Sequence, residues 1–442
     1  MVKLTDNLKS KAVNGSIWTL SGYGAGQLLR LVSNVILAKL LFPEAFGLMM
    51  LVTIFVQGIG MFSDIGIGQS IIQNKRGEES TFLNTAWTMQ IFRGFCIWVL
   101  ACLGASTYAN IFDEPSLSTL IPVAGLVAVI SGFNSTALAT SNRKLMLKKI
   151  TILNFVTQLL AVVVMIAWVL ISPTVWGLIA GGIISSLFKM VMTHLWLQDN
   201  FRNQIYFDKE SAKQLFTFGK WILFSTALTF FTLQIDRLLL GYYMDAAMLG
   251  VYSIAAMFTM FSQNLIQKLS SKVLFPSYSE IIRQGNDTRL YKVLIKTRLI
   301  MISGTWLLSI VLIVLGSYLI NILYDERYAD ATWMIQILPL GALVGILSLT
   351  YQNVMLAKGR SSYITLILIV QLIIQITAIS LGNYLNGIMG IIIGYTTVGW
   401  ILYPLNAFLA NKIKVWQPII DFPVIILAII FVVFYSNVIN IG

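Results

Sequence analysis

The chain has 442 residues, of which 57% are hydrophobic and only 11% charged, and this composition excludes an ordinary soluble globular protein. Its 30 lysines and arginines outnumber 18 acidic residues, and the net charge of +12 would suggest nucleic-acid binding in a soluble protein. Here the basic residues gather in the connections between apolar segments, as in membrane proteins, so we expect no nucleic-acid partner.

Apolar segments long enough to cross a bilayer, each needing about 20 residues, recur along the whole chain. The sequence predicts thirteen membrane helices at residues 11–40, 45–70, 82–108, 117–141, 148–171, 175–198, 214–243, 246–275, 293–322, 331–357, 361–383, 388–411 and 418–440. We therefore predict an all-α integral membrane protein with about 12 to 14 transmembrane helices.

The lysines and arginines predict how the helices are oriented. With a cytoplasmic N-terminus, 24 of the 30 basic residues, Arg298 among them, fall on the cytoplasmic side, two lie at outer helix ends and four lie within helices. This distribution obeys the positive-inside rule. The outer connections are short and hold mostly acidic residues, so no external domain is expected.

An internal duplication predicts the domain organisation. Residues 119–143 align without a gap on residues 336–360, and the five identical positions include a proline and an arginine. Six helices per repeat would make two parallel lobes, residues 1–200 and 201–413, followed by an extra C-terminal transmembrane helix at 414–442. We expect a transported substrate to bind in the cleft between such lobes.

Four stretches carry a resemblance to a known family: FSDIGIGQSIIQNK at 62–75, DRLLLGYYMDAAMLGVYSIAAMF at 236–258, KVLFPSYSEI at 272–281 and VMLAKGR at 354–360. Over nearly the whole chain, the sequence resembles the polysaccharide-transporter branch of the multidrug/oligosaccharidyl-lipid/polysaccharide exporter superfamily. It is most similar to the flippases of colanic acid and O-antigen repeat units.

The resemblance implies a location in the bacterial inner membrane and transport by alternating access. The implied substrate is an undecaprenyl-diphosphate-linked oligosaccharide, carried from the cytoplasmic to the periplasmic leaflet for O-antigen, exopolysaccharide or capsule synthesis. The implied partners are this lipid, membrane lipids, a proton or sodium ion as coupling ion, and a polysaccharide polymerase with its chain-length regulator. No cofactor is expected.

Four basic side chains lie inside predicted helices, where a charge costs at least ~2.5–3.5 kcal/mol on insertion scales. These candidate substrate-binding residues are Arg30, Arg93, Lys189 and Arg237. The planar donor fork of arginine is suited to a diphosphate, so several such cations along a cleft could carry the head group between leaflets. The alternative for each is an internal ion pair, which is favoured for Arg237 because Asp236 precedes it.

Asp64 and Asp236 are the carboxylates predicted to lie well inside helices, and they are candidate ion-coupling residues. Asp64 precedes the sequence IGIG, whose glycines should loosen the helix and expose its backbone. The alternatives for Asp64 are a helix cap or a salt bridge to Arg93. Asp236 could instead meet Arg30 as a latch between the lobes.

Three classes of function differ in what they require. A flippase of lipid-linked oligosaccharides agrees with the topology, the duplication and the buried cations. A multidrug or cation antiporter of the same superfamily is the alternative. Its cavity should be acidic or aromatic to attract cations, whereas this chain has four basic and two acidic residues deep within its predicted helices. An enzyme would need a larger outer loop. Cys96 and Cys102 lie six residues apart on one helix inside lipid, so neither a disulfide nor a metal site is expected.

Overall fold

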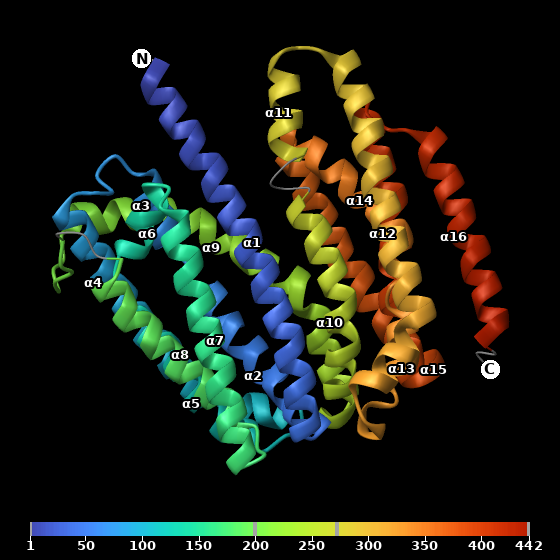
Figure 1. Ribbon diagram of the computed structural model, residues 1–442, viewed down its shortest axis with the longest axis horizontal. Coiled ribbons are helices and arrows are strands. Elements are labelled where there is room, and N and C mark those ends of the chain that lie inside the picture. The colour runs from blue at the N-terminus through green and yellow to red at the C-terminus, as the bar shows by residue number, and fades with distance from the viewer. Residues whose placement is uncertain (1, 198–200, 270–273, 440–442) are drawn as a thin grey trace. The chain divides into compact units, whose positions relative to one another are not determined.

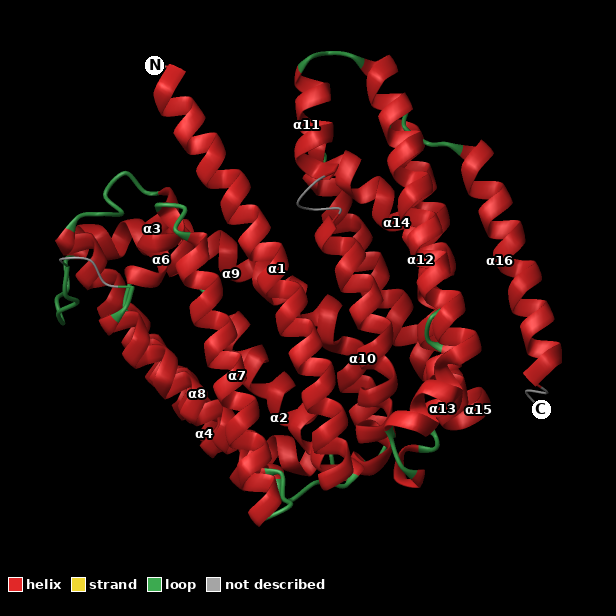
Figure 2. Ribbon diagram, viewed as in Figure 1, coloured by secondary structure: helices red, strands yellow, loops and turns green. Residues whose placement is uncertain are grey.

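The computed structural model describes residues 2–197, 201–269 and 274–439, and within these ranges all regular structure is helical (Figures 1 and 2). The chain forms two compact units, Met1–Phe230 and Phe231–Gly442. Their boundary falls inside helix α9 (Lys209–Tyr243) rather than at residue 200. The six-helix lobes, their duplication and the separate C-terminal segment stay predictions.

The N-terminal unit contains eight complete helices and the first part of α9 among its described residues. These helices are α1 (Val2–Leu40), α2 (Pro43–Phe62), α3 (Ile67–Gln73), α4 (Ser80–Ile111), α5 (Leu117–Gly132), α6 (Ala137–Arg143), α7 (Leu147–Ile171) and α8 (Trp176–Leu195). Helix α4 packs along α5, and α7 packs along both α8 and α1. Glycine permits the first contact, because a Cβ on Gly94 of α4 would lie 2.6 Å from the carbonyl oxygen of Ala128 on α5.

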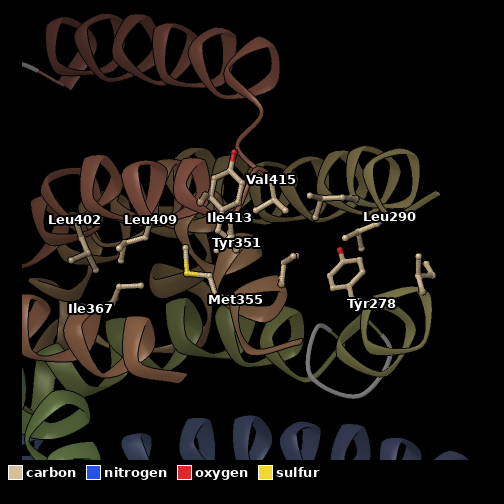
Figure 3. Close-up of a cluster of buried hydrophobic side chains, with 13 residues drawn as sticks. Tyr278, Leu290, Tyr351, Met355, Ile367, Leu402, Leu409, Ile413 and Val415 are labelled. Carbon is tan, nitrogen blue, oxygen red and sulfur yellow. The ribbon is translucent and has the colours of Figure 1, made fainter. Parts of the chain in front are cut away.

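The C-terminal unit contains the rest of α9 and the remaining helices. These are α10 (Ala246–Leu269), α11 (Phe275–Arg283), α12 (Asp287–Leu323), the short 3-10 helix η2 (Glu326–Tyr328), α13 (Ala331–Ile337), α14 (Leu340–Ala357), α15 (Ser361–Lys412) and α16 (Pro418–Ile439). A buried apolar cluster joins α11, α12, α14 and α15 (Figure 3). Tyr278, Leu290, Tyr351 and Ile367 are among its members.

Helix α15 is two arms joined by a sharp turn. Asn386 has non-helical backbone angles and Gly387 adopts a left-handed φ of +54°, which glycine tolerates. A Cβ on Gly382 would overlap the carbonyl oxygen of Gly390, and one on Gly394 would overlap that of Ala378. The two arms therefore pack backbone to backbone, and they coincide with the two spans predicted at 361–383 and 388–411.

Each of the thirteen predicted spans overlaps described helices, although 45–70 and 117–141 are each broken within the span and fewer helices pass a strict test of length and composition. Within the described residues, eight helices are long and apolar enough to cross a membrane, or nine if the bent pair α5 and α6 is one span. Helix α15 accounts for two predicted spans, whereas α1, α9 and α10, which coincide with three more, are not among the eight. The all-α membrane class is confirmed.

Candidate functional site

The second predicted span is broken just where Asp64 and its following glycines lie. Helix α2 ends at Phe62 and α3 begins at Ile67, and Gly66 between them has a left-handed φ of +60°. The Asp64 carboxylate accepts a hydrogen bond from the Gly66 amide at 2.9 Å. The predicted loosening of this helix is confirmed, and the break leaves the last carbonyl groups of α2 without partners in their own helix.

Arg93 of α4 satisfies these carbonyl groups. Its Nε donates to the Ser63 carbonyl at 2.8 Å, and its Nη2 donates to the Gly60 carbonyl at 2.7 Å. A cation at a helix C-terminus also interacts favourably with the helix dipole. Asp64 lies 4.0 Å from Nη2, so the salt bridge to Arg93, the alternative weighed for Asp64, is present. Within the described structure, Nη1 makes no hydrogen bond.

A second break separates α5 from α6, which are bent by 60°. Side chains from neighbouring helices bind the exposed backbone there. Gln90 Nε2 of α4 donates to the carbonyl groups of Ser131, Gly132 and Asn134 at 3.0–3.2 Å. His194 of α8 places Nε2 2.8 Å from the Phe133 carbonyl oxygen. The bend is therefore held by polar side chains of both flanking helices.

A cavity of about 550 Å³, here called the N-terminal cavity, lies at these two breaks. Residues of α3, α4, α5 and α6 line it, and its polar side chains include Asp64, Gln69, Gln90, Arg93 and Asn142. Helix α3 packs on α6, so the two breaks are close together. Transporters commonly bind substrates and ions where membrane helices are discontinuous. Arg93 and Asp64 are the predicted site residues that the fold brings into this cavity.

Asp236 and Arg237 lie in the C-terminal unit, near the end of α9. Asp236 is 2% exposed, and its Oδ1 has no hydrogen-bond partner among the described residues. Arg237 donates to Gln234 Oε1 at 3.2 Å and lies 2.9 Å from the sulfur of Met260. In the described structure Arg237 forms no salt bridge, so the ion pair favoured for it is not seen.

Both residues line a second cavity of about 520 Å³, here called the C-terminal cavity. Helices α9, α10, α12 and α14 and both arms of α15 contribute to its wall. Its lining is rich in carboxamides, a feature that sequence reasoning missed because the glutamines are scattered over four helices. The amides are Gln234, Gln263, Asn264, Gln352, Gln371 and Gln375.

The remaining predicted site residues lie outside both cavities. Arg30 is exposed on α1, and Lys189 is half-buried on α8. Neither side chain lines the N-terminal or the C-terminal cavity, and neither makes a hydrogen bond or ion pair with the described residues. Their role in substrate binding, and the latch between Arg30 and Asp236, stay predictions.

Arg298, which the sequence places on the cytoplasmic side of the membrane, lies in the interior of the C-terminal unit. Its side chain is fully buried, and Nη2 lies 2.5 Å from Oδ1 of Asp421, which is also fully buried in the first turn of α16. Its Nη1 donates to the Tyr351 hydroxyl at 2.7 Å and its Nε to Thr350 at 3.0 Å. Its position inside the predicted span 293–322 was the available signal. The pair ties the last helix to α12.

Comparisons with known proteins agree with this architecture. A family model described as "Polysaccharide biosynthesis protein" matches residues 36–332. The chain is 21% identical over 412 residues to the lipopolysaccharide biosynthesis protein WzxC of Escherichia coli strain K12, covering 92% of this chain and 82% of that protein.

Two solved structures are similar in fold. The lipid II flippase MurJ in an inward closed conformation matches with a TM-score of 0.72 at 13% identity, covering 96% of this chain and 93% of that one. An inward-facing multidrug resistance MATE family transporter of the MOP superfamily matches with a TM-score of 0.68 at 13% identity, covering 88% and 94%. Since the family model spans more than half of the sequence, the chain is a multi-pass membrane protein that belongs to the polysaccharide biosynthesis protein family.

Proposed function

We propose that the protein flips undecaprenyl-diphosphate-linked oligosaccharide repeat units from the cytoplasmic to the periplasmic leaflet for surface polysaccharide synthesis. Family membership and the names of WzxC and MurJ support transport of a lipid-linked saccharide rather than catalysis. The observation that carries the proposal is the N-terminal cavity, which places an arginine and a carboxylate at two breaks in apolar helices.

Arg93 has the geometry of an anion-binding residue held in place by the protein. Two of its nitrogens are fixed by the end of α2, which leaves Nη1 for a ligand that enters the cavity. A diphosphate is an anion with several acceptor oxygens, and an arginine binds such a group with strong, directed hydrogen bonds. Arg30 and Lys189 extend this role as further cations for the head group.

Asp64 provides a means of coupling transport to an ion. Its contact with Arg93 is 4.0 Å long, so a diphosphate can compete for the arginine. A carboxylate that loses its cationic partner binds a proton or sodium ion more readily. Uptake of an ion at Asp64 would then accompany binding of the diphosphate, and release would accompany its departure. Asp236 is the second carboxylate proposed for coupling.

The proposal also specifies the membrane that holds the protein and the direction of transport. The protein lies in the inner membrane with a cytoplasmic N-terminus, as the positive-inside distribution favours. Alternating access exposes the head group to one leaflet at a time. A polysaccharide polymerase and a chain-length regulator would act on the exported units. A multidrug or cation antiporter remains the alternative function, because MATE transporters share the fold.

Complementation tests the proposal. In a strain that lacks its repeat-unit flippase, wild type, Arg93→Ala and Arg93→Lys are expressed at matched membrane levels. Arg283→Ala is the matched control, because this arginine is 74% exposed and its one ion pair among the described residues is with Glu280 on its own helix. Surface polysaccharide and the accumulation of lipid-linked repeat units are measured.

We expect wild type and the control to restore export, Arg93→Ala to lower it more than tenfold, and Arg93→Lys to restore part of it. Normal export by Arg93→Ala would contradict the role of the N-terminal cavity. A wild type that restores no polysaccharide but lowers cellular uptake of a cationic dye would support the antiporter instead.

A further inference from the structure

The C-terminal cavity is polar but carries almost no net charge. Six carboxamides line it, together with the hydroxyl groups of Thr232, Thr305, Ser348, Tyr395 and Thr396. Asp236 and Arg237 are the charged residues of its lining, and their opposite charges balance. As a whole, a lining of this kind favours neither a large anion such as a diphosphate nor a large organic cation.

Four polar atoms of this lining have no hydrogen-bond partner among the described residues. They are Asp236 Oδ1, Arg237 Nε, Ser348 Oγ and Gln375 Oε1. Asp236, Ser348 and Gln375 are only 2%, 4% and 5% exposed. Buried polar groups are normally paired, so several unpaired ones around a single cavity point to a polar ligand.

The chemistry of the lining identifies the class of ligand. A carboxamide both donates and accepts hydrogen bonds, as a sugar hydroxyl does, so a set of amides can pair with a polyhydroxylated molecule without charge. A volume of about 520 Å³ lies within the usual range of ligand cavities, roughly 300–1,000 Å³. Gln263 and Asn264 are exposed, so the cavity reaches the surface of its unit.

We propose that the C-terminal cavity binds neutral sugar residues of the transported substrate. This inference rests on the proposed function, since it assumes a saccharide cargo, but it does not depend on which residues hold the diphosphate. It assigns the discrimination between different repeat units to the amides of the C-terminal unit. The cationic residues then handle the part of the substrate that all such lipids share.

Gln352 and Gln371 are the best positions for a test. Both are half-buried in the cavity wall, on α14 and on the first arm of α15, and neither side chain makes a hydrogen bond within the described structure. Methionine has a similar length and shape but cannot form these hydrogen bonds. The double variant Gln352→Met/Gln371→Met should therefore fold normally. Gln73→Met, an exposed glutamine of α3 outside both cavities, is the matched control.

The proteins are purified in lipid nanodiscs, and dissociation constants are measured for two probes. The first is the lipid-linked repeat unit that accumulates in the flippase-deficient strain, and the second is bare undecaprenyl diphosphate. We expect wild type and Gln73→Met to bind the sugar-bearing lipid at least tenfold more tightly than the bare lipid. The double variant should lose about tenfold in affinity for the first probe, as two lost hydrogen bonds imply, and keep its affinity for the second.

Two outcomes would overturn the inference in distinguishable ways. If the double variant melts like wild type and keeps its preference for the sugar-bearing lipid, the cavity does not bind sugars, whereas the flippase function stands. If wild type binds neither lipid, the proposed function fails and this inference fails with it. Ser348→Ala provides a second test, because it removes an unpaired hydroxyl from the same wall and should lower the same preference.

Discussion

Removal of the Asp421 carboxylate should be among the most damaging single changes in the C-terminal unit. Asp421 accepts hydrogen bonds from Arg298 at 2.5 Å, from the Tyr351 hydroxyl at 2.6 Å and from the Tyr403 hydroxyl at 2.9 Å. Both charged partners are fully buried, so Asp421→Ala leaves an uncompensated cation away from water. Breaking a buried pair in this way costs about 3–5 kcal/mol of unfolding free energy.

A double variant separates the cost of the unpaired buried charge from the loss of the two tyrosine hydrogen bonds. The double variant Arg298→Met/Asp421→Leu removes both charges and fills similar space, so it should recover most of the lost stability. Arg283→Ala breaks an exposed pair with Glu280 and should change stability by less than about 1 kcal/mol.

Unfolding in detergent, followed by tryptophan fluorescence against a denaturant, measures these differences. We expect the order wild type, exposed-pair control, double variant, and finally Asp421→Ala as the least stable. An Asp421→Ala protein that unfolds with the wild-type midpoint would refute the reasoning, because a buried arginine cannot lose its anion without cost. A double variant as unstable as the single one would show that packing, rather than charge, holds α16.

Three further predictions concern the helix breaks and the hairpin of α15. Arg93→Ala should lower the unfolding free energy by about 3 kcal/mol in the same denaturant assay, since it removes charge-assisted bonds to two carbonyl groups; an unchanged midpoint would contradict the capping role. Gln90→Leu should increase hydrogen exchange of the amides between α5 and α6, because three carbonyl groups lose their donor; wild-type exchange rates would count against it. Gly394→Val should abolish recovery of folded protein by size-exclusion chromatography, whereas Gly304→Ala, with open space around it, should be recovered normally; equal recovery would mean that the arms of α15 do not pack as closely as described.

The sequence alone was sufficient for the class of protein, the positions of its helices and one of its breaks. Hydropathy acts over each segment of about 20 residues independently of the rest of the chain, so each of the thirteen predicted spans overlaps a described helix. The break after Asp64 was predictable as well, because glycine loosens a helix through its own backbone freedom.

Only the tertiary structure decided which polar side chains meet. Arg298 and Asp421 are 123 residues apart, and although the position of Arg298 inside a predicted span signals burial, no local pattern identifies its partner. The amides of the C-terminal cavity come from helices distant in sequence, and the unpaired atoms among them are recognisable only when their neighbours are known. Arg93 was identified from its charge, but its role as the cap of α2 depends on packing between helices. Burial in lipid is a property of a segment, whereas pairing is a property of the fold.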